Sequence, residues 1–375
     1  MIHFRFEYSG FRSFRLYYEL SAMNHELSTM NYEPSTKLKV IHFQRKPRPR
    51  FNFSIESIFE DLRSRLKDKA DVAVKTSSYF NNGYLSKLWN IAEAALRQKK
   101  NAVNHITGEV NFLGLLMRKK NTLLTIHDCR YVERKKGFEK IMIQWLYLKA
   151  PVKQAGYITA VSEHTKKEII RYTACDPGKI QVIPVPLNPF FKPSPKTFNK
   201  ECPVILQIGV GENKNIFRLV KALKNMNCSL VIIGEPNNKI LEQLMQNNIK
   251  HTIKFNLSTA ELYNEYVNAD IISFVSTYEG FGMPIAEANC VERVVITSNI
   301  SSMPEVARDA ACLVDPYDVE DIKNGLLKII HDDTYREQLI LNGKTNKLRF
   351  NGQLIADAYY KLYKKIAQQC RYEYN

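Results

Sequence analysis

Two glutamates lie eight positions apart on either side of a glycine-rich turn. The turn reads Gly-Phe-Gly-Met-Pro over residues 280–284, with Glu279 before it and Glu287 after it. The apolar run 269–275 precedes it and has the composition of a buried parallel strand. The two glycines let the backbone turn sharply and approach a ligand, and the proline fits the first position of a helix. We therefore expect a strand, a loop and a helix N-terminus that bind an anion, with both carboxylates facing one crevice.

A second loop with suitable chemistry follows the apolar run 203–208. It begins with Gly209 and Gly211 and ends with Lys214 and Asn215, just before a helical pattern. A dinucleotide-binding fingerprint would require glycine where Lys214 stands, so the loop does not favour an NAD site. A lysine near a helix start can instead neutralise a leaving nucleoside diphosphate. An exposed loop lysine is the alternative interpretation.

A histidine and an aspartate, His127 and Asp128, directly follow the apolar run 122–126. They would therefore lie at the carboxyl end of a strand, where parallel sheets bind their ligands. The alternatives are a histidine whose hydrogen bonds are satisfied within the domain and an aspartate that caps a helix. The sequence contains no Asp-x-Asp motif and no histidine cluster, so we expect no metal ion at the site.

The elements that position these residues alternate regularly. Strand-like apolar runs are separated by amphipathic helical patterns, for example at 54–66 and 85–97, and a further long pattern covers 353–369. A proline cluster divides the alternation into two series, at Pro184, Pro186, Pro189, Pro193 and Pro195. This pattern predicts an α/β fold with two doubly wound parallel sheets.

The positive charge is concentrated in the first half of the chain. The first 186 residues contain 32 Lys and Arg against 17 Asp and Glu, whereas the remainder contains 22 against 21. A solvated surface, an anionic membrane face and an anionic acceptor all fit this asymmetry. We hypothesise that Arg45, Lys46, Arg48 and Arg50, with the basic run 118–120, contact such a membrane or a phosphate-bearing acceptor. Nucleic acid is not expected as a partner, because no helix-turn-helix, zinc-finger spacing or RNA-binding motif occurs.

The spacing of the cysteines and the length of the apolar runs indicate in which cellular compartment the protein is expected. The seven cysteines stand singly, without any C-x-x-C pair, as expected for reduced thiols. No apolar run reaches the roughly 18 residues that a membrane span requires. We therefore expect a cytoplasmic protein, with the inner face of the membrane as a further location.

The segment 276–287 resembles the signature of family 4 glycosyltransferases of the group 1 type, which are retaining enzymes with the GT-B fold. This resemblance implies that Glu279 lies at the donor sugar, near the anomeric carbon, and that Glu287 binds the nucleotide ribose. It also implies that the loop between the glutamates contacts sugar hydroxyls and phosphate. The loop residues concerned are Gly280, Phe281, Gly282, Met283 and Pro284.

The same resemblance extends to the other two loops. The loop from Gly209 to Asn215 is similar to the family's phosphate-binding loop, with Lys214 as the phosphate ligand. The arginine that usually precedes the lysine is Asn213 here, so the second cation of the site is not identified. His127 is similar to a histidine that lies near the donor sugar and completes the catalytic pair with Glu279.

The resemblance further implies a domain arrangement and an activity. We expect a divergent segment at 1–36, a Rossmann-like acceptor domain at 37–186, a linker at 187–202, a nucleotide-sugar domain at 203–350 and a C-terminal helix at 351–375 that returns to the first domain. The activity is transfer of a sugar from a nucleotide-sugar donor to a saccharide or lipid-linked acceptor in polysaccharide or glycoconjugate synthesis, without a cofactor. The alternatives are a nucleotide-sugar 2-epimerase, a glucan synthase-like enzyme, and a non-catalytic binding protein that uses the basic half.

Overall fold

The computed structural model describes residues 37–47, 54–81, 83–133 and 136–371. The expected divergent segment 1–36 lies outside the described residues, as do Arg48 and Arg50 of the basic loop.

The first parallel sheet contains six strands in the order β2-β1-β3-β4-β5-β6. These strands are β1 (Leu38–Gln44), β2 (Ala70–Thr76), β3 (Val103–Ile106), β4 (Thr122–Ile126), β5 (Tyr157–Ala160) and β6 (Ile180–Val182). In the register, Val40 of β1 is paired with Val72 on one side and Val103 on the other. Every residue of β3 and β4 is buried, because helices cover both faces of a parallel sheet.

The second sheet also has six parallel strands, in the order β12-β11-β10-β7-β8-β9. The strands are β7 (Val204–Ile208), β8 (Ser229–Ile233), β9 (His251–Lys254), β10 (Ile271–Phe274), β11 (Val294–Ser298) and β12 (Cys312–Val314). The chain order reverses between β7 and β10, which are neighbours. Such a reversal opens a crevice at the carboxyl ends of the two strands, where ligands bind in this class of sheet.

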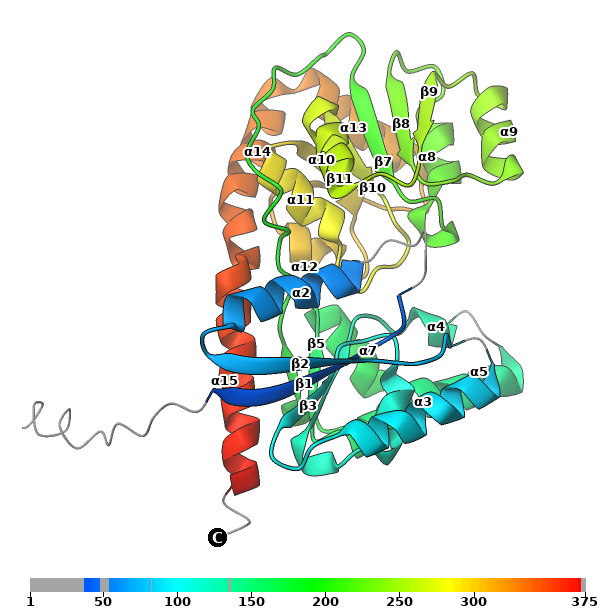
Figure 1. The fold of residues 1–375 in the computed structure, drawn as a ribbon. Helices are drawn as coiled ribbons and strands as arrows, with labels where there is room; N and C mark the ends of the chain where they lie inside the picture. The colour runs from blue at the N-terminus through cyan, green and yellow to red at the C-terminus, as the bar shows by residue number, and fades with distance from the viewer. Residues whose placement is uncertain (1–36, 48–53, 82, 134–135, 372–375) are drawn as a thin grey trace, which may run out of the picture. The chain divides into compact units, whose positions relative to one another are not determined.

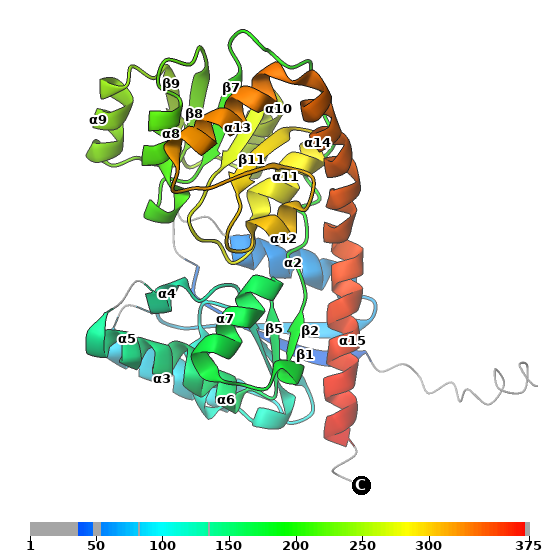
Figure 2. The same ribbon diagram turned by 180° about the vertical axis from the view of Figure 1, so that it is seen from behind.

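Helices cover both faces of each sheet. In the first half they are α2 (Ser54–Leu66), α3 (Tyr84–Arg97), α4 (Arg130–Glu133), α5 (Gly137–Gln144), α6 (Ala150–Gln154) and α7 (Glu163–Thr173). In the second half they are α8 (Ile216–Ala222), α9 (Asn238–Gln246), α10 (Thr259–Asn268), α11 (Met283–Val291), α12 (Met303–Ala307), α13 (Val319–His331) and α14 (Asp333–Asn346). Figure 1 shows α10 and α11 in front of the second sheet, and Figure 2 shows α8 and α13 on its other face.

Short helical turns connect several of these elements. They include η1 (Asn111–Leu116), the π-helical turn η3 (Trp145–Lys149), η5 (Glu212–Lys214) and η6 (Lys347–Phe350). Ser162 caps α7, since its side chain accepts a hydrogen bond from the Thr165 N–H.

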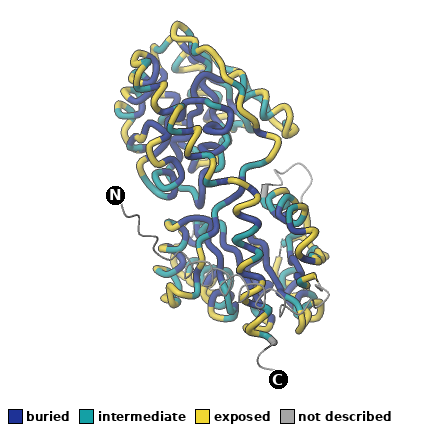
Figure 3. The backbone as a smooth tube through the Cα atoms, turned by 90° about the vertical axis from the view of Figure 1, so that its left-hand side faces the viewer, coloured by how far each residue is buried: buried dark blue, intermediate teal, exposed yellow. Residues whose placement is uncertain are grey.

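The interior consists of apolar layers on the two faces of each sheet. One layer of the second sheet includes Leu219 and Leu326, and the other includes Ile272 and Ile285. In Figure 3 the buried backbone runs through the interior of each half, and the exposed backbone lies on surface helices and loops. Because the strands of both sheets are packed between these layers, the loops that follow them are held at fixed positions along the sheet edge.

The last helix, α15 (Gly352–Arg371), returns to the first sheet, as expected. It packs against α2, β1 and β3 and runs beside them in Figure 1. The buried Tyr363 hydroxyl lies 3.0 Å from His42 Nε2 and 2.8 Å from His105 Nδ1. This contact joins the C-terminal helix to two neighbouring strands of the first sheet.

Candidate active site

The loop between β10 and α11 is held by serine hydroxyls from the segment after β11. The Glu279 N–H donates to Ser301 Oγ at 3.1 Å, and the Glu279 carbonyl accepts from the Ser301 and Ser302 hydroxyls at 2.7 and 2.9 Å. Gly282 has φ +124° and is the residue before α11. The loop therefore needs glycine at 282 for its backbone conformation.

Gly280 also allows a close contact between the two halves of the chain. A Cβ atom at this position would lie 1.9 Å from the His127 carbonyl oxygen and 2.8 Å from the Asp128 Cβ. The missing side chain thus permits close contact with the loop after β4 of the first half, which is a reason for glycine that the sequence did not reveal. The contact brings His127 beside the Glu279 loop.

Helix α7 of the first half also holds this loop. The Gly280 carbonyl accepts hydrogen bonds from Ser162 Oγ at 2.6 Å and from Thr165 Oγ1 at 3.0 Å. Nearby, the Tyr278 hydroxyl donates to Glu168 and accepts from the Cys129 N–H at 3.1 Å. These bonds join the halves at the edge where both sets of strands end.

Lys214 and Glu279 form an ion pair. Lys214 Nζ lies 2.7 Å from Glu279 Oε1, and Asn213 Nδ2 donates to the same oxygen at 3.0 Å. The Lys214 ammonium also lies 4.6 Å from the centre of the Phe274 ring. Asn213, which stands where the family usually has an arginine, therefore orients Glu279 and does not supply a second cation.

Two further predicted residues of this loop, Gly209 and Asn215, lie beneath the Lys214 side chain or in the interior. Gly209 has φ +85°, and a Cβ there would lie 3.1 Å from Lys214 Cε. Asn215 is buried, and its amide nitrogen donates to the carbonyls of Val275 and Pro316 at 3.0 and 2.6 Å. Neither Gly209 nor Asn215 is among the described residues that line the cleft, so the structure does not bring them to the site surface.

Glu287 lies in the first turns of α11, with the buried Tyr266 below it. The Tyr266 hydroxyl donates a hydrogen bond to the Glu287 carboxylate. Burial raises the pKa of Glu287 to about 7, although the tyrosine hydrogen bond and the Lys214 charge oppose this rise. The carboxylate is therefore close to half-ionised at neutral pH and can accept hydrogen bonds in its ionised form.

His127 is neutral at physiological pH. Its Nε2 lies 2.9 Å from the Thr107 carbonyl oxygen, so this nitrogen carries the proton and Nδ1 is the acceptor. Burial lowers the pKa of His127, and burial also raises the pKa of its neighbour Asp128. The pair is thus a neutral imidazole beside a buried carboxyl group at the end of β4.

These side chains line one cleft of about 1330 Å³ between the ends of the two sheets. Its lining includes His127, Lys214, Glu279 and Glu287, and every residue of the loop 280–284. A cavity for a single drug-sized ligand measures roughly 300–1,000 Å³, so this cleft has room for two substrates. Lys214 is the single lysine or arginine among the described lining residues.

Carboxylates from the first half line the opposite wall of the cleft. They are Glu60 and Asp61 of α2, Glu109 after β3, and Asp128. The first three were not predicted from the sequence, because their approach to the glycine loop requires the folded chain. Tyr266 was missed for the same reason, since its partner Glu287 is 21 residues away.

The sequence matches two family descriptions that together cover most of the chain. Residues 20–189 match "Glycosyltransferase Family 4", and residues 190–346 match "Glycosyl transferases group 1". The chain belongs to the group 1, family 4 glycosyltransferases.

One relative of this glycosyltransferase is the O-antigen chain mannosyltransferase B of Escherichia coli. It is 27% identical over 283 residues, which cover 68% of this chain and 72% of the relative.

Solved structures agree with the GT-B fold. Sucrose-phosphate synthase from Thermosynechococcus elongatus superposes with a TM-score of 0.73 at 17% identity, over 87% of this chain and 99% of the other. The Anabaena protein HepE, in complex with UDP and glucose, gives a TM-score of 0.71 at 14% identity, over 88% of this chain and 100% of the other. At these identities the likeness concerns the fold alone.

Within the described part of the glycosyltransferase, no helix is both long enough and apolar enough to cross a bilayer.

Proposed function

We propose that the protein is a retaining glycosyltransferase that moves a hexosyl group from a nucleoside-diphosphate sugar to a hydroxyl of a saccharide or lipid-linked acceptor. The observation that carries this proposal is the Lys214–Glu279 ion pair at the carboxyl ends of β7 and β10, beside the N-terminus of α11. The helix dipole and the ammonium both favour negative charge at this place.

The donor is assigned to the second half. Lys214 and the N-terminus of α11 neutralise the departing diphosphate, so that charge develops against positive groups that are already in position. No metal ion is needed for this step. Glu287 accepts hydrogen bonds from the ribose hydroxyls, and Glu279 and His127 contact the transferred sugar. Lys214 then exchanges its Glu279 partner for the diphosphate when the donor binds.

The acceptor is assigned to the wall formed by the first half. Four carboxylates line that wall, and Arg45 nearby is engaged by Glu56, with Nε 2.6 Å from Oε1, and by Glu109. Carboxylates accept hydrogen bonds from sugar hydroxyls but repel phosphate. The part of the acceptor that enters the cleft is therefore a saccharide, whose hydroxyls can donate hydrogen bonds to these carboxylates.

Two relationships support the class of reaction. The Escherichia coli relative is an O-antigen chain mannosyltransferase, and the Anabaena neighbour was solved with UDP and glucose. We assign this chain to the same kind of chemistry, with the synthesis of a surface polysaccharide as its setting. Retention is the stereochemical course that the family resemblance implies, and NMR analysis of the product anomer tests it.

The test of the donor site compares Lys214→Met with Glu279→Gln by isothermal titration with UDP, GDP and ADP. The lysine variant loses a charged hydrogen bond, which is worth roughly 1.5–3 kcal/mol, so the preferred diphosphate should bind about ten- to a hundredfold more weakly. The glutamine variant releases Lys214 from its partner, so binding should be retained or tighter while transfer collapses. Lys221→Met, on the exposed side of α8, is the matched control. Equal binding and turnover in all variants would refute the assignment.

A further inference from the structure

Helix α3 carries a second apolar face that packing within the described chain does not explain. Its inner face is buried at Ile91 and Ala94. On the outer side, large apolar residues recur at helical spacing and are open to solvent. Their exposed fractions are 83% for Leu85, 62% for Leu88, 59% for Trp89 and 85% for Leu96. A surface helix of a globular protein ordinarily presents polar side chains outward.

A similar stripe lies on α5 and the following turn η3. The helix buries none of its residues, and its apolar side chains recur at i, i+3, i+4 and i+7. Their exposed fractions are 80% for Phe138, 65% for Ile141, 36% for Met142 and 57% for Trp145. We call these four residues, together with the four outer residues of α3, the α3–α5 surface.

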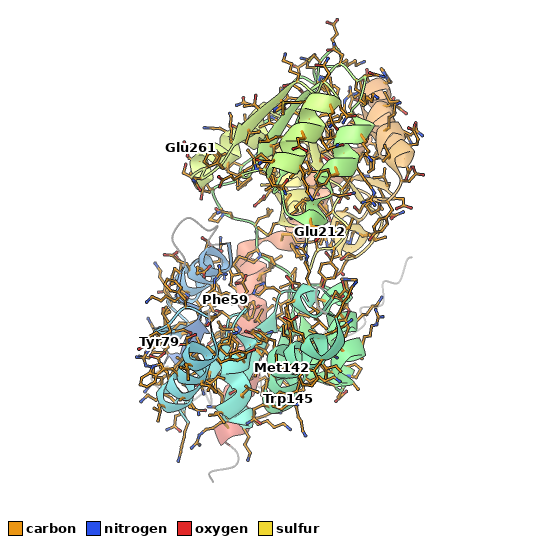
Figure 4. The ribbon with its side chains drawn as sticks, turned by 90° about the vertical axis from the view of Figure 1, so that its right-hand side faces the viewer. Phe59, Tyr79, Met142, Trp145, Glu212 and Glu261 are labelled. Atoms are coloured by element: carbon orange, nitrogen blue, oxygen red, sulfur yellow. The ribbon has the colours of Figure 1, made fainter. Side chains whose placement is uncertain are left out.

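The turn η3, which follows α5, approaches α3. Lys87 Nζ lies 5.5 Å from the ring centre of Tyr84 in α3 and 5.6 Å from that of Tyr147 in η3. Figure 1 shows α3 and α5 next to each other. Figure 4 labels Met142 and Trp145 close together, with Tyr79 farther to the left of the view. The Tyr79 ring packs edge-on against Trp89 at 6.2 Å. Both tryptophans of the chain therefore lie on the α3–α5 surface.

Basic residues border this surface. The segments 83–100 and 136–154 contain eight Lys and Arg against two acidic residues, Glu93 and Glu139. Glu93 is paired with Arg97 at 2.9 Å. The exposed Arg118 adds to the border, since its N–H donates to Gln98 at the end of α3. The surface thus combines an apolar centre, two interfacial aromatic residues and a positive rim.

We propose that the α3–α5 surface docks the protein onto the headgroup region of an anionic phospholipid bilayer. The apolar stripes enter the boundary between headgroups and acyl chains, as amphipathic helices do when they lie in the plane of the interface. The tryptophans occupy the interface with their amphipathic rings. The lysines bury their stems and direct their ammonium groups to lipid phosphates.

This assignment moves the membrane contact away from the basic loop that the sequence suggested. Arg45 is paired with Glu56 and Glu109 and contributes no uncompensated charge, and Arg48 and Arg50 lie outside the described residues. The basic run 118–120 remains part of the proposed membrane contact, because Arg118 lies next to the end of α3. Docking of a second copy of the chain is disfavoured, because two positive rims would face each other. The inference is independent of the proposed glycosyl transfer.

The experiment mixes the full chain with vesicles of phosphatidylcholine alone or of phosphatidylcholine with phosphatidylglycerol. Binding is measured by co-sedimentation and by tryptophan fluorescence, which reports on this surface because it holds both tryptophans. We expect binding and a blue shift with anionic vesicles, weakened by salt. Leu88→Glu with Ile141→Glu should lower partitioning at least about tenfold. Lys136→Gln and Lys140→Gln should each weaken it about fivefold.

The matched control is Met245→Glu with Leu341→Glu, two exposed apolar residues of the second half. It should bind vesicles like the unmodified chain, and circular dichroism should show that both double variants are folded. Absence of vesicle binding by the unmodified chain would overturn the proposal, as would equal loss in the two double variants. Self-association that Leu88→Glu with Ile141→Glu abolishes, without vesicle binding, would identify a contact between copies and overturn it as well.

Discussion

At the scale of single residues, the cleft contains two motif carboxylates, Glu279 and Glu287, that lie in different electrostatic surroundings. Glu279 is neutralised by Lys214 at 2.7 Å. Glu287 lies against the buried Tyr266, and burial raises its pKa to about 7. The two glutamates of the sequence motif therefore lie in different surroundings: Glu279 is paired with a cation, whereas burial dominates the environment of Glu287 and outweighs its hydrogen bond from Tyr266.

The protonation of Glu287 predicts a pH dependence of donor binding. If its carboxylate accepts hydrogen bonds from the ribose, the ionised form binds better, and affinity for the nucleoside diphosphate should rise as pH increases through 7. With a pKa of about 7, the ionised fraction grows from about one tenth at pH 6 to about nine tenths at pH 8. Isothermal titration of wild type and Glu287→Gln measures this, since the ionisation of the ligand itself is common to both. Parallel pH curves for the two proteins would contradict the ribose assignment.

At the scale of elements, α15 is attached to the first sheet by a buried polar contact as well as by apolar packing. Tyr363 bonds both His42 and His105, and His105 Nε2 continues to Thr125 Oγ1 at 2.7 Å. Buried polar groups cost free energy when they lose a partner. The tyrosine hydroxyl therefore fixes the position of the helix relative to β1 and β3.

Removing this hydroxyl should destabilise the protein without changing its shape. Tyr363→Phe leaves two buried ring nitrogens without this partner, so the free energy of unfolding should fall by roughly 1–3 kcal/mol. Urea denaturation with an unchanged m-value measures the loss. Tyr360→Phe, one turn away and half-buried, should change stability by at most about 0.5 kcal/mol. Equal effects of the two substitutions would show that the histidine contacts contribute nothing.

At the scale of the whole molecule, the contact between the halves contains a carboxyl group with an altered pKa. Burial raises the pKa of Glu168 to about 7, from its ordinary value of 4.5, although the Tyr278 hydrogen bond opposes the rise. A raised folded-state pKa favours the protonated form. Its contribution to stability is present below pH 4.5 and is lost as pH rises through 7.

Glu168→Gln should therefore change stability in a pH-dependent way. Glutamine resembles the protonated carboxyl, so the variant and wild type should melt at similar temperatures at pH 5. At pH 8 the variant should be more stable, by at most about 3.5 kcal/mol, since one pKa unit corresponds to about 1.4 kcal/mol. Differential scanning calorimetry at both pH values measures this, with the exposed Glu337→Gln as control. A variant that is less stable at pH 8 would show that the ionised carboxylate stabilises the contact.

The sequence alone determined the features that depend on neighbouring residues. Apolar runs at 122–126 and 203–208 predicted β4 and β7. The loop 280–284 identified the family, because a strand, a glycine turn and a helix start are read from consecutive residues. The alternation of these signals was enough to predict two parallel sheets.

Only the tertiary structure decided how distant segments meet. It placed His127 against Gly280, paired Lys214 with Glu279, and buried Asn215 behind the site. It also showed that the outer stripe of α3 remains exposed, although the sequence gives both stripes of that helix the same apolar character. The physical reason is that side-chain period and turn chemistry act over a few residues, whereas ion pairs, pKa shifts and exposure depend on groups that folding brings from far along the chain.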